Sequence, residues 1–243
     1  LQVVCLAMIV RRMTGPDDGI DTALRDRLIV ATLAHTPFDG WSPAALRAGA
    51  RDIDVSDDVA QAAFPHGTSD MIRHFSRWAD RCMIAGLEAA DLDEMRIHER
   101  VTIAVELRLE ALEPHREAVR RGLSWLAMPQ NALLGARLLY RTVDDIWYAV
   151  GDRSADFSFY TKRGLLAGVV GSTTLFWLDD SSEGGTETSD FLDRRIADVM
   201  RISSVRRRTE HLGKKTPNPL RILRDVARKR YGGLASRGGA HPR

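Results

Sequence analysis

The chain has 243 residues, of which 44% are hydrophobic and 28% charged, and this composition excludes an intrinsically disordered protein. Its two cysteines, Cys5 and Cys82, lack the spacing of a zinc site. The net charge of +2 is unevenly distributed, because residues 201–243 carry thirteen Lys and Arg against only Glu210 and Asp225. The body is therefore acidic and the tail strongly basic. A basic tail of this kind favours phosphates, either of nucleic acid or of lipid headgroups.

Residues 1–20 begin with the apolar run LQVVCLAMIV, which two arginines follow. A secretory signal carries its positive charge before the apolar core, so this order argues against export. We expect residues 1–20 to be disordered, or the protein to start at Met13. No apolar run in the sequence reaches the roughly eighteen residues that a membrane-spanning helix needs.

Apolar residues recur at helical spacing along the whole chain, and strand-like alternation is almost absent. Leu24, Leu28 and Ala31 show the pattern early in the chain, and Ile103 and Leu107 repeat it later. Pro and Gly residues divide the chain into about nine or ten helical segments. The sequence therefore predicts an all-α fold.

Residues 21–80 have the turn spacing of a helix-turn-helix. A helix at 21–36 precedes the turn Gly40–Trp41, and a second helix begins after Ser42. A short helix from Ser56 to Phe64 and a fourth helix follow. This order is similar to the start of TetR-type regulators.

The short helix from Ser56 to Phe64 would be the one that enters the major groove of DNA. It begins with Asp57 and Asp58 and contains no Lys or Arg. Phosphate contacts supply most of the affinity for DNA, and two carboxylates would repel the backbone. We therefore expect a degenerate helix-turn-helix that binds no nucleic acid.

Motifs that carry catalysis are absent from the sequence. It contains no nucleophile elbow, phosphate loop or dinucleotide fingerprint. The seven histidines are scattered, and none follows a glutamate at the spacing of a carboxylate-bridged metal site. The expectation is a protein that is not an enzyme and that holds no metal or cofactor.

The block RTVDDIWYAVGDRSADFSFYTKRGLLAGVVGSTTLFWLDDSS, residues 141–182, carries the most specific signal. Together with the preceding LAMPQNALLGARLLYRTVDDIW and the following FLDRRIADVM, it resembles the coenzyme Q biosynthesis accessory proteins known as the ninth Coq protein family. The resemblance runs from about Asp21 to Met200 and is specific at 125–200. It implies a TetR-like fold with a disabled DNA-binding module.

The resemblance also implies a protein that binds isoprenoid quinone intermediates or phospholipid. The helix from about Asp156 to Asp179 would then border the cavity, with Gly164 and Gly168 leaving a shallow groove. For any single one of Leu165, Leu166, Val169 and Val170, packing in the core is the better explanation. The predicted lipid-binding residues are Leu138, Leu165, Leu166, Gly168, Val169, Thr173 and Phe176.

A second expectation from the family is a partner, the demethoxyubiquinone hydroxylase. Positions i, i+3, i+4 and i+7 of the helix would form one exposed face with an acid, two aromatics and a guanidinium. A capping Asp with half-buried aromatics explains the same pattern equally well. The predicted partner-binding residues are Asp156, Phe159, Tyr160 and Arg163.

The tail predicts a membrane-binding helix. After a helical body at 81–210, whose last helix should end near Arg208, a linker at 211–219 leads to LRILRDVARKRYGG. Over 220–232 this segment separates apolar from basic residues, as in helices that lie in a membrane interface; 233–243 would be disordered. A nucleic-acid arm or a helix folded back on the body remain as alternatives. The predicted membrane-binding residues are Leu220, Arg221, Ile222, Leu223, Arg224, Val226 and Arg228.

Two functions follow from these patterns. The first is a non-enzymatic lipid-binding accessory protein of ubiquinone biosynthesis. It would be cytoplasmic and peripheral on the inner membrane, or on the matrix side of the mitochondrial inner membrane in a eukaryote. The second is a TetR-type transcriptional regulator with an apolar ligand pocket. The family resemblance also suggests a homodimer.

Overall fold

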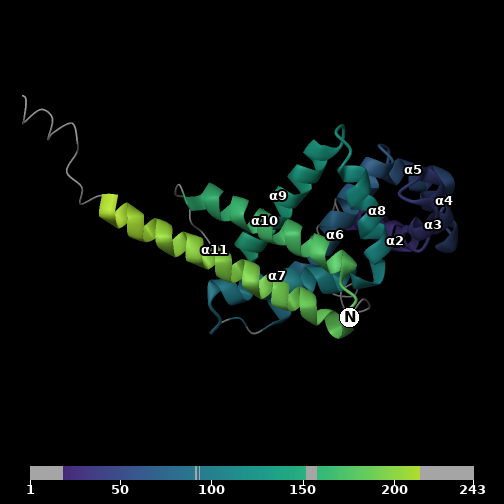
Figure 1. The fold of residues 1–243 in the computed structure, drawn as a ribbon. Coiled ribbons are helices and arrows are strands. Elements are labelled where there is room, and N and C mark those ends of the chain that lie inside the picture. The colour runs from purple at the N-terminus through teal and green to yellow at the C-terminus, as the bar shows by residue number, and fades with distance from the viewer. Residues whose placement is uncertain (1–18, 91, 93, 152–157, 214–243) are drawn as a thin grey trace, which may run out of the picture. The chain divides into compact units, whose positions relative to one another are not determined.

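The computed structural model describes the backbone of residues 19–90, 92, 94–151 and 158–213 (Figure 1). Side chains are described within these ranges, except those of 19–21, 158–160 and 202–213. The described residues form helices and turns with no strand among them, which confirms the predicted all-α fold.

The helices expected within residues 21–80 are present. In chain order they are α2 (Gly19–Leu33), α3 (Thr36–Asp39), α4 (Pro43–Asp52) and α5 (Asp57–Ala63). The Ser42 hydroxyl oxygen accepts the N–H of Ala45, and that of Ser56 accepts the N–H of Val59. Both serines therefore cap the helices that the sequence assigned to them.

The backbones of helices α2 and α4 pack unusually close to each other. Gly49 of α4 is buried, and a Cβ at this position would lie 2.5 Å from the backbone nitrogen of Thr32 in α2. Only a residue without a side chain allows the two backbones to approach this closely. The packing of the first helices depends on that glycine.

The body consists of longer helices that follow a turn at Gly67. They are α6 (Thr68–Ala89), α7 (Ile97–Leu112), α8 (Arg116–Leu126), α9 (Ala132–Ala149), α10 (Ser158–Asp179) and α11 (Thr186–Gly213), with the short 3₁₀ turns η1 (Glu113–His115) and η2 (Glu183–Gly185). Helix α6 contacts α2, α7 and α9, and half of its residues are buried, so it forms the centre of the fold.

Buried ionic contacts join α2 to α6. The Oδ1 atom of Asp26 lies 2.6 Å from Nε2 of His74 and also contacts the guanidinium of Arg81. Burial lowers the pKa of His74 in spite of the opposing effect of Asp26. These contacts fix the first helices against the body.

The chain divides after Ile196 into a unit of residues 1–196 and a unit of residues 197–243. Helix α11 continues to Gly213 and does not end near Arg208 as expected, so residues 211–213 of the predicted linker are helical. The predicted membrane helix at 220–232 and the tail at 233–243 lie outside the described residues, as do residues 1–18. None of the described helices is long and apolar enough to cross a membrane.

Candidate ligand cavity

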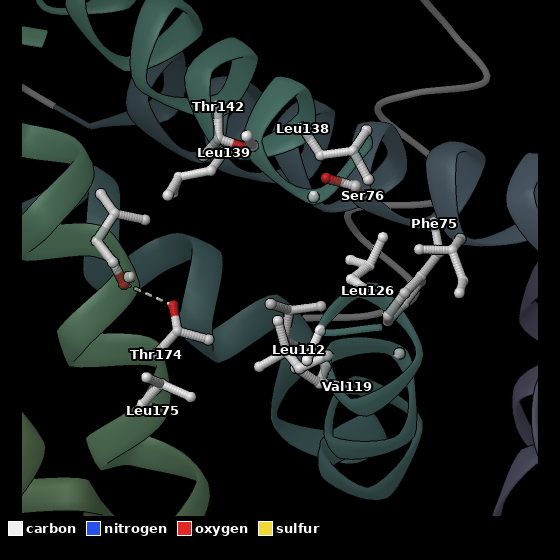
Figure 2. Close-up of a pocket in the computed structure, with 18 of the residues that line it drawn as sticks. Phe75, Ser76, Leu112, Val119, Leu126, Leu138, Leu139, Thr142, Thr174 and Leu175 are labelled. Atoms are coloured by element: carbon white, nitrogen blue, oxygen red, sulfur yellow. Dashed lines mark hydrogen bonds between the residues drawn. The ribbon is translucent and has the colours of Figure 1, made fainter. Parts of the chain in front are cut away.

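A cavity of about 440 Å³ lies among helices α6 to α10 (Figure 2). Its size falls in the range of small-molecule sites, and its walls are mostly apolar. Each helix contributes residues at helical spacing, so that one stripe of each faces the cavity. The clearest stripe is that of α9, with Ala132, Gly135, Ala136, Leu138, Leu139 and Thr142.

Four other helices and one turn complete the lining. Among the described residues that precede α6, only Trp41 lines the cavity, and its indole N–H donates to the carbonyl oxygen of Ala118 in α8 at 2.8 Å. Helix α6 contributes Ile72, Phe75 and Ser76, and α7 contributes Arg108 and Leu112. The residues from α8 are Ala118, Val119, Gly122, Leu123 and Leu126, followed by Ala127 at its end. Helix α10 contributes Val170, Gly171, Thr174 and Leu175.

Glycine keeps space open at the wall formed by α10. A Cβ at Gly171 would meet only Leu139 Cδ2, at 3.8 Å, so a larger side chain there would extend into the cavity. Leu175, one turn further along, lines the cavity and is nevertheless 61% exposed. The cavity therefore reaches the molecular surface beside α10.

Polar side chains on the lining are few, and two of them donate to one buried carboxylate. Asp80 of α6 is buried behind the wall and accepts hydrogen bonds from Nε of Arg108 at 2.8 Å and from Oγ1 of Thr142 at 3.0 Å. Nη2 of Arg108 lies 3.5 Å from the hydroxyl oxygen of Ser76. The hydroxyl of Thr174, which also lines the cavity, lies outside this group, because it donates to the Val170 carbonyl oxygen within α10.

A second carboxylate lies near this group on α9. Burial raises the pKa of Asp145, and the charge of Asp80 adds to the effect. Among the described residues, no group of three His, Cys, Asp or Glu is arranged to hold a metal ion.

The predicted lipid-binding residues are only partly on this cavity. Helix α10 borders the cavity as expected, and Leu138 of α9 lines it. The other six predicted residues do not line it. Leu166, Val169 and Thr173 are buried in the core, which is the alternative that the sequence left open.

The last three predicted residues lie elsewhere on α10. Leu165 is half-buried, and Phe176 stacks on Phe191 of α11 with ring centroids 4.5 Å apart. Gly168 is exposed, and a Cβ there would meet no atom within 4 Å. The lining face of α10 is thus the neighbouring one, with Val170, Gly171, Thr174 and Leu175. Lipid contact at the six residues stays a prediction.

The predicted partner face is described at one residue only. Arg163 is buried, and its Nη2 lies 2.6 Å from Oδ1 of Asp144 in α9, so the expectation of an exposed guanidinium is wrong. Its role is to pair α10 with α9. Asp156 lies outside the described residues, and of Phe159 and Tyr160 only the helical backbone is described. The predicted membrane-binding residues, Leu220 to Arg228, also lie outside the described residues.

Sequence reasoning missed the part of the lining that comes from α8 and Trp41. The segment REAVRRGLSWL has its apolar and basic residues on opposite faces, so the buried face of α8 could have been predicted. The contact of Trp41 with Ala118 spans 77 residues of chain and has no local signal.

Comparison with known proteins gives a family match to two of the helices that line the cavity. The family model COQ9 matches residues 132–203, which comprise α9, α10 and most of α11. In this segment the chain is similar to the COQ9 family. The resemblance predicted from residues 125–200 is thereby confirmed.

Relatives in this family are similar over most of the chain. The rat "Ubiquinone biosynthesis protein COQ9, mitochondrial" is 32% identical over 78% of this chain and 63% of its own length. The protein of the same name from Xenopus tropicalis is 34% identical over 74% and 59%. The "Probable ubiquinone biosynthesis protein coq9, mitochondrial" of Dictyostelium discoideum is 38% identical over 73% and 60%. The chain spans less than two thirds of each of these relatives.

The fold of this chain is that of TetR regulators. A TetR transcriptional regulator from Nitrosomonas europaea superposes with a TM-score of 0.61 at 20% identity, over 73% of this chain and 98% of the regulator. The likeness confirms the predicted TetR-like fold.

Proposed function

We propose that this protein binds an isoprenoid lipid in the cavity and presents it to a partner in ubiquinone biosynthesis, without itself catalysing a reaction. The observation that carries the proposal is the largely apolar cavity, which opens beside the exposed Leu175. The COQ9 match supports it, because the matched residues supply two of the cavity's walls. A long apolar chain would gain about 25 cal/mol for each Å² of surface that it buries there.

The names of the relatives support a role in ubiquinone biosynthesis and a mitochondrial location. They are called ubiquinone biosynthesis proteins and mitochondrial. We further propose that the protein acts at the inner membrane, on the matrix side in a eukaryote, with anionic lipid as its surface and a demethoxyubiquinone hydroxylase as its partner. A bound isoprenoid quinone or phospholipid would be cargo and not a cofactor.

A paired substitution on α10 tests the lipid site. Gly171→Leu should fill the cavity and remove bound lipid, whereas Gly168→Leu adds the same side chain to the exposed face three residues earlier. Both changes favour the helix by roughly 0.5–1 kcal/mol, so neither should unfold it. The measurement is mass spectrometry of organic extracts from the purified proteins.

The expected result is isoprenoid lipid in wild type and Gly168→Leu, and at least a tenfold loss in Gly171→Leu. Equal lipid in all three proteins would contradict binding in this cavity. Loss in Gly168→Leu alone would instead support the groove predicted from the glycines.

Substitution of the predicted partner face tests presentation. A central aromatic contact contributes ~2 kcal/mol or more to a protein interface. Tyr160→Ala and Phe159→Ala should therefore each weaken co-purification with the hydroxylase, and leave the melting temperature unchanged. If both variants co-purify with the hydroxylase as wild type does, the interface lies elsewhere on the protein.

The alternative of a DNA-binding regulator is less well supported than lipid presentation. The short helix α5 has Asp57 and Asp58 in its first turn, both exposed, and no basic residue in its last turn. The likeness to a TetR regulator concerns the fold alone.

A further inference from the structure

The polar groups of the cavity are gathered around Asp80 and not spread over its walls. Ser76, Arg108 and Thr142 come from three different helices, and all three line the cavity. Asp80 accepts from two of them, and Arg108 reaches the third. An apolar cavity would not require this arrangement, since buried polar groups cost free energy unless they are hydrogen-bonded.

Arg108 has donors to spare. Its side chain is 12% exposed, and its Nε and Nη2 are engaged by Asp80 and Ser76. Its Nη1 forms no hydrogen bond or ion pair with the residues that the structure describes. A guanidinium carries five N–H donors, so several remain for an acceptor that enters the cavity.

The charge of this group is balanced without a ligand. Asp80 is buried and lies against the guanidinium, so the pair presents hydrogen-bond donors with no net charge. A phosphate would approach the carboxylate that lies directly behind the arginine and be repelled by it. Its contacts with the arginine would then not offset the free energy needed to remove the phosphate from water. A neutral oxygen, such as the carbonyl of a quinone or a ketone, gains the hydrogen bond at a lower desolvation cost.

We propose that Arg108, positioned by Asp80 and supported by Ser76, recognises a neutral oxygen acceptor on the ring of an otherwise apolar ligand. This inference rests on the proposed lipid-binding function and adds to it the position and chemistry of the headgroup. Thr142 acts as a positioning residue, because its hydroxyl holds Asp80 from the opposite helix. The apolar chain then extends along α9 and α10 toward the opening at Leu175.

Matched probes test this site in the full chain after removal of bound lipid. The probes are hexyl phenyl ketone, hexylbenzene and hexyl phosphate, and their affinities are measured by displacement of the uncharged fluorescent probe phenylnaphthylamine. Ketone and hexylbenzene differ by one carbonyl group. A hydrogen bond from a charged donor should make the ketone bind roughly tenfold more tightly than hexylbenzene, with hexyl phosphate the weakest.

Substitution of the arginine should abolish the preference for the ketone. Arg108→Met keeps the unbranched apolar stem of the side chain and removes the guanidinium, so hexylbenzene should bind as before and the ketone at least tenfold more weakly than to wild type. Arg137→Met, at an exposed position of α9 off the cavity, should leave all three affinities unchanged. If the unpaired Asp80 unfolds Arg108→Met, the double variant Asp80→Asn with Arg108→Met removes both charges and carries the same expectation.

The outcomes separate this inference from the proposed function. If none of the probes displaces the dye, both the lipid site and its headgroup end are wrong. Equal affinity of wild type for ketone and hexylbenzene would overturn the headgroup inference alone. Tightest binding of hexyl phosphate would also overturn it, and would identify an anionic lipid as the ligand.

Discussion

The indole N–H of Trp41 donates to the carbonyl oxygen of Ala118, so a residue of the turn that precedes α4 closes the wall of the ligand cavity. The Cβ that Gly122 lacks would lie 3.3 Å from Nε1 of this tryptophan. Trp41 also packs against Phe75 of α6, with ring centroids 5.4 Å apart. One side chain therefore connects α4, α6 and α8.

Trp41→Phe should lower the free energy of unfolding by about 1–3 kcal/mol. The substitution removes a buried hydrogen bond and part of a buried ring, and both losses destabilise. Chemical denaturation monitored by circular dichroism measures the effect. Phe38→Leu, at an aromatic residue that is 84% exposed, is the control and should stay within about 0.5 kcal/mol of wild type. A Trp41→Phe variant as stable as this control would contradict the role given to the contact.

Asp180 should make the stability of the protein depend on pH in the acid range. Hydrogen bonds from Ser182 and Thr188 hold the pKa of this carboxyl far below its usual range. Since the folded pKa is depressed, the stabilisation is complete above the unfolded value of about 3.9 and is lost as the pH falls toward the folded pKa. Asp180→Asn should therefore be less stable than wild type at pH near 7.

The measurement is thermal unfolding of wild type and Asp180→Asn across the acid range. The two melting temperatures should differ at neutral pH and converge as the pH falls below about 4. Ser181→Ala, at the exposed neighbour, is the control. A difference between wild type and Asp180→Asn that is independent of pH would show that the carboxylate charge is not what matters.

The helix α5 should not bind DNA. Its first turn presents two exposed carboxylates where a recognition helix meets phosphates. A gel-shift experiment at low salt, with a chain that ends at Lys215 so that the basic tail is absent, should show no sequence-selective retention of duplex. Selective retention would restore the regulator as the better function.

The basic tail should carry the protein to anionic membranes. Each cation near the surface adds about 1 kcal/mol of attraction, and the apolar side chains enter the acyl boundary. Full-length protein should float with anionic liposomes more than with neutral ones and less in high salt, whereas Leu223→Asp should abolish flotation. Equal flotation of a chain that ends at Lys215 would refute the assignment of the tail.

Local signals in the sequence predicted the first part of the fold well. Ser42 and Ser56 cap helices through hydrogen bonds to residues three positions later, and such contacts are visible in a sequence. The end of α11 was placed too early, because the segment between Arg208 and Gly213 contains no helix breaker before its glycine.

The lining of the cavity was harder to predict than the helix that borders it. Helix α10 is apolar or small on nearly every face, so its periodicity does not say which stripe meets the cavity and which meets the core. The packing of α9 decides which stripe meets the cavity. Leu139 of α9, for example, lies beside the place where a Cβ of Gly171 would be. Asp80 and Thr142 are 62 residues apart, and only the packing of α6 on α9 brings them together.

The approach of α4 to α2 at Gly49 has a consequence for how this chain can vary. A methyl group there would overlap the backbone nitrogen of Thr32, which no change of rotamer can relieve. Even Gly49→Ala should separate the two helices, while neighbouring exposed positions such as Arg47 accept any side chain. A saturation library of α4 selected for soluble expression should therefore recover every amino acid except proline at Arg47, and glycine alone at Gly49.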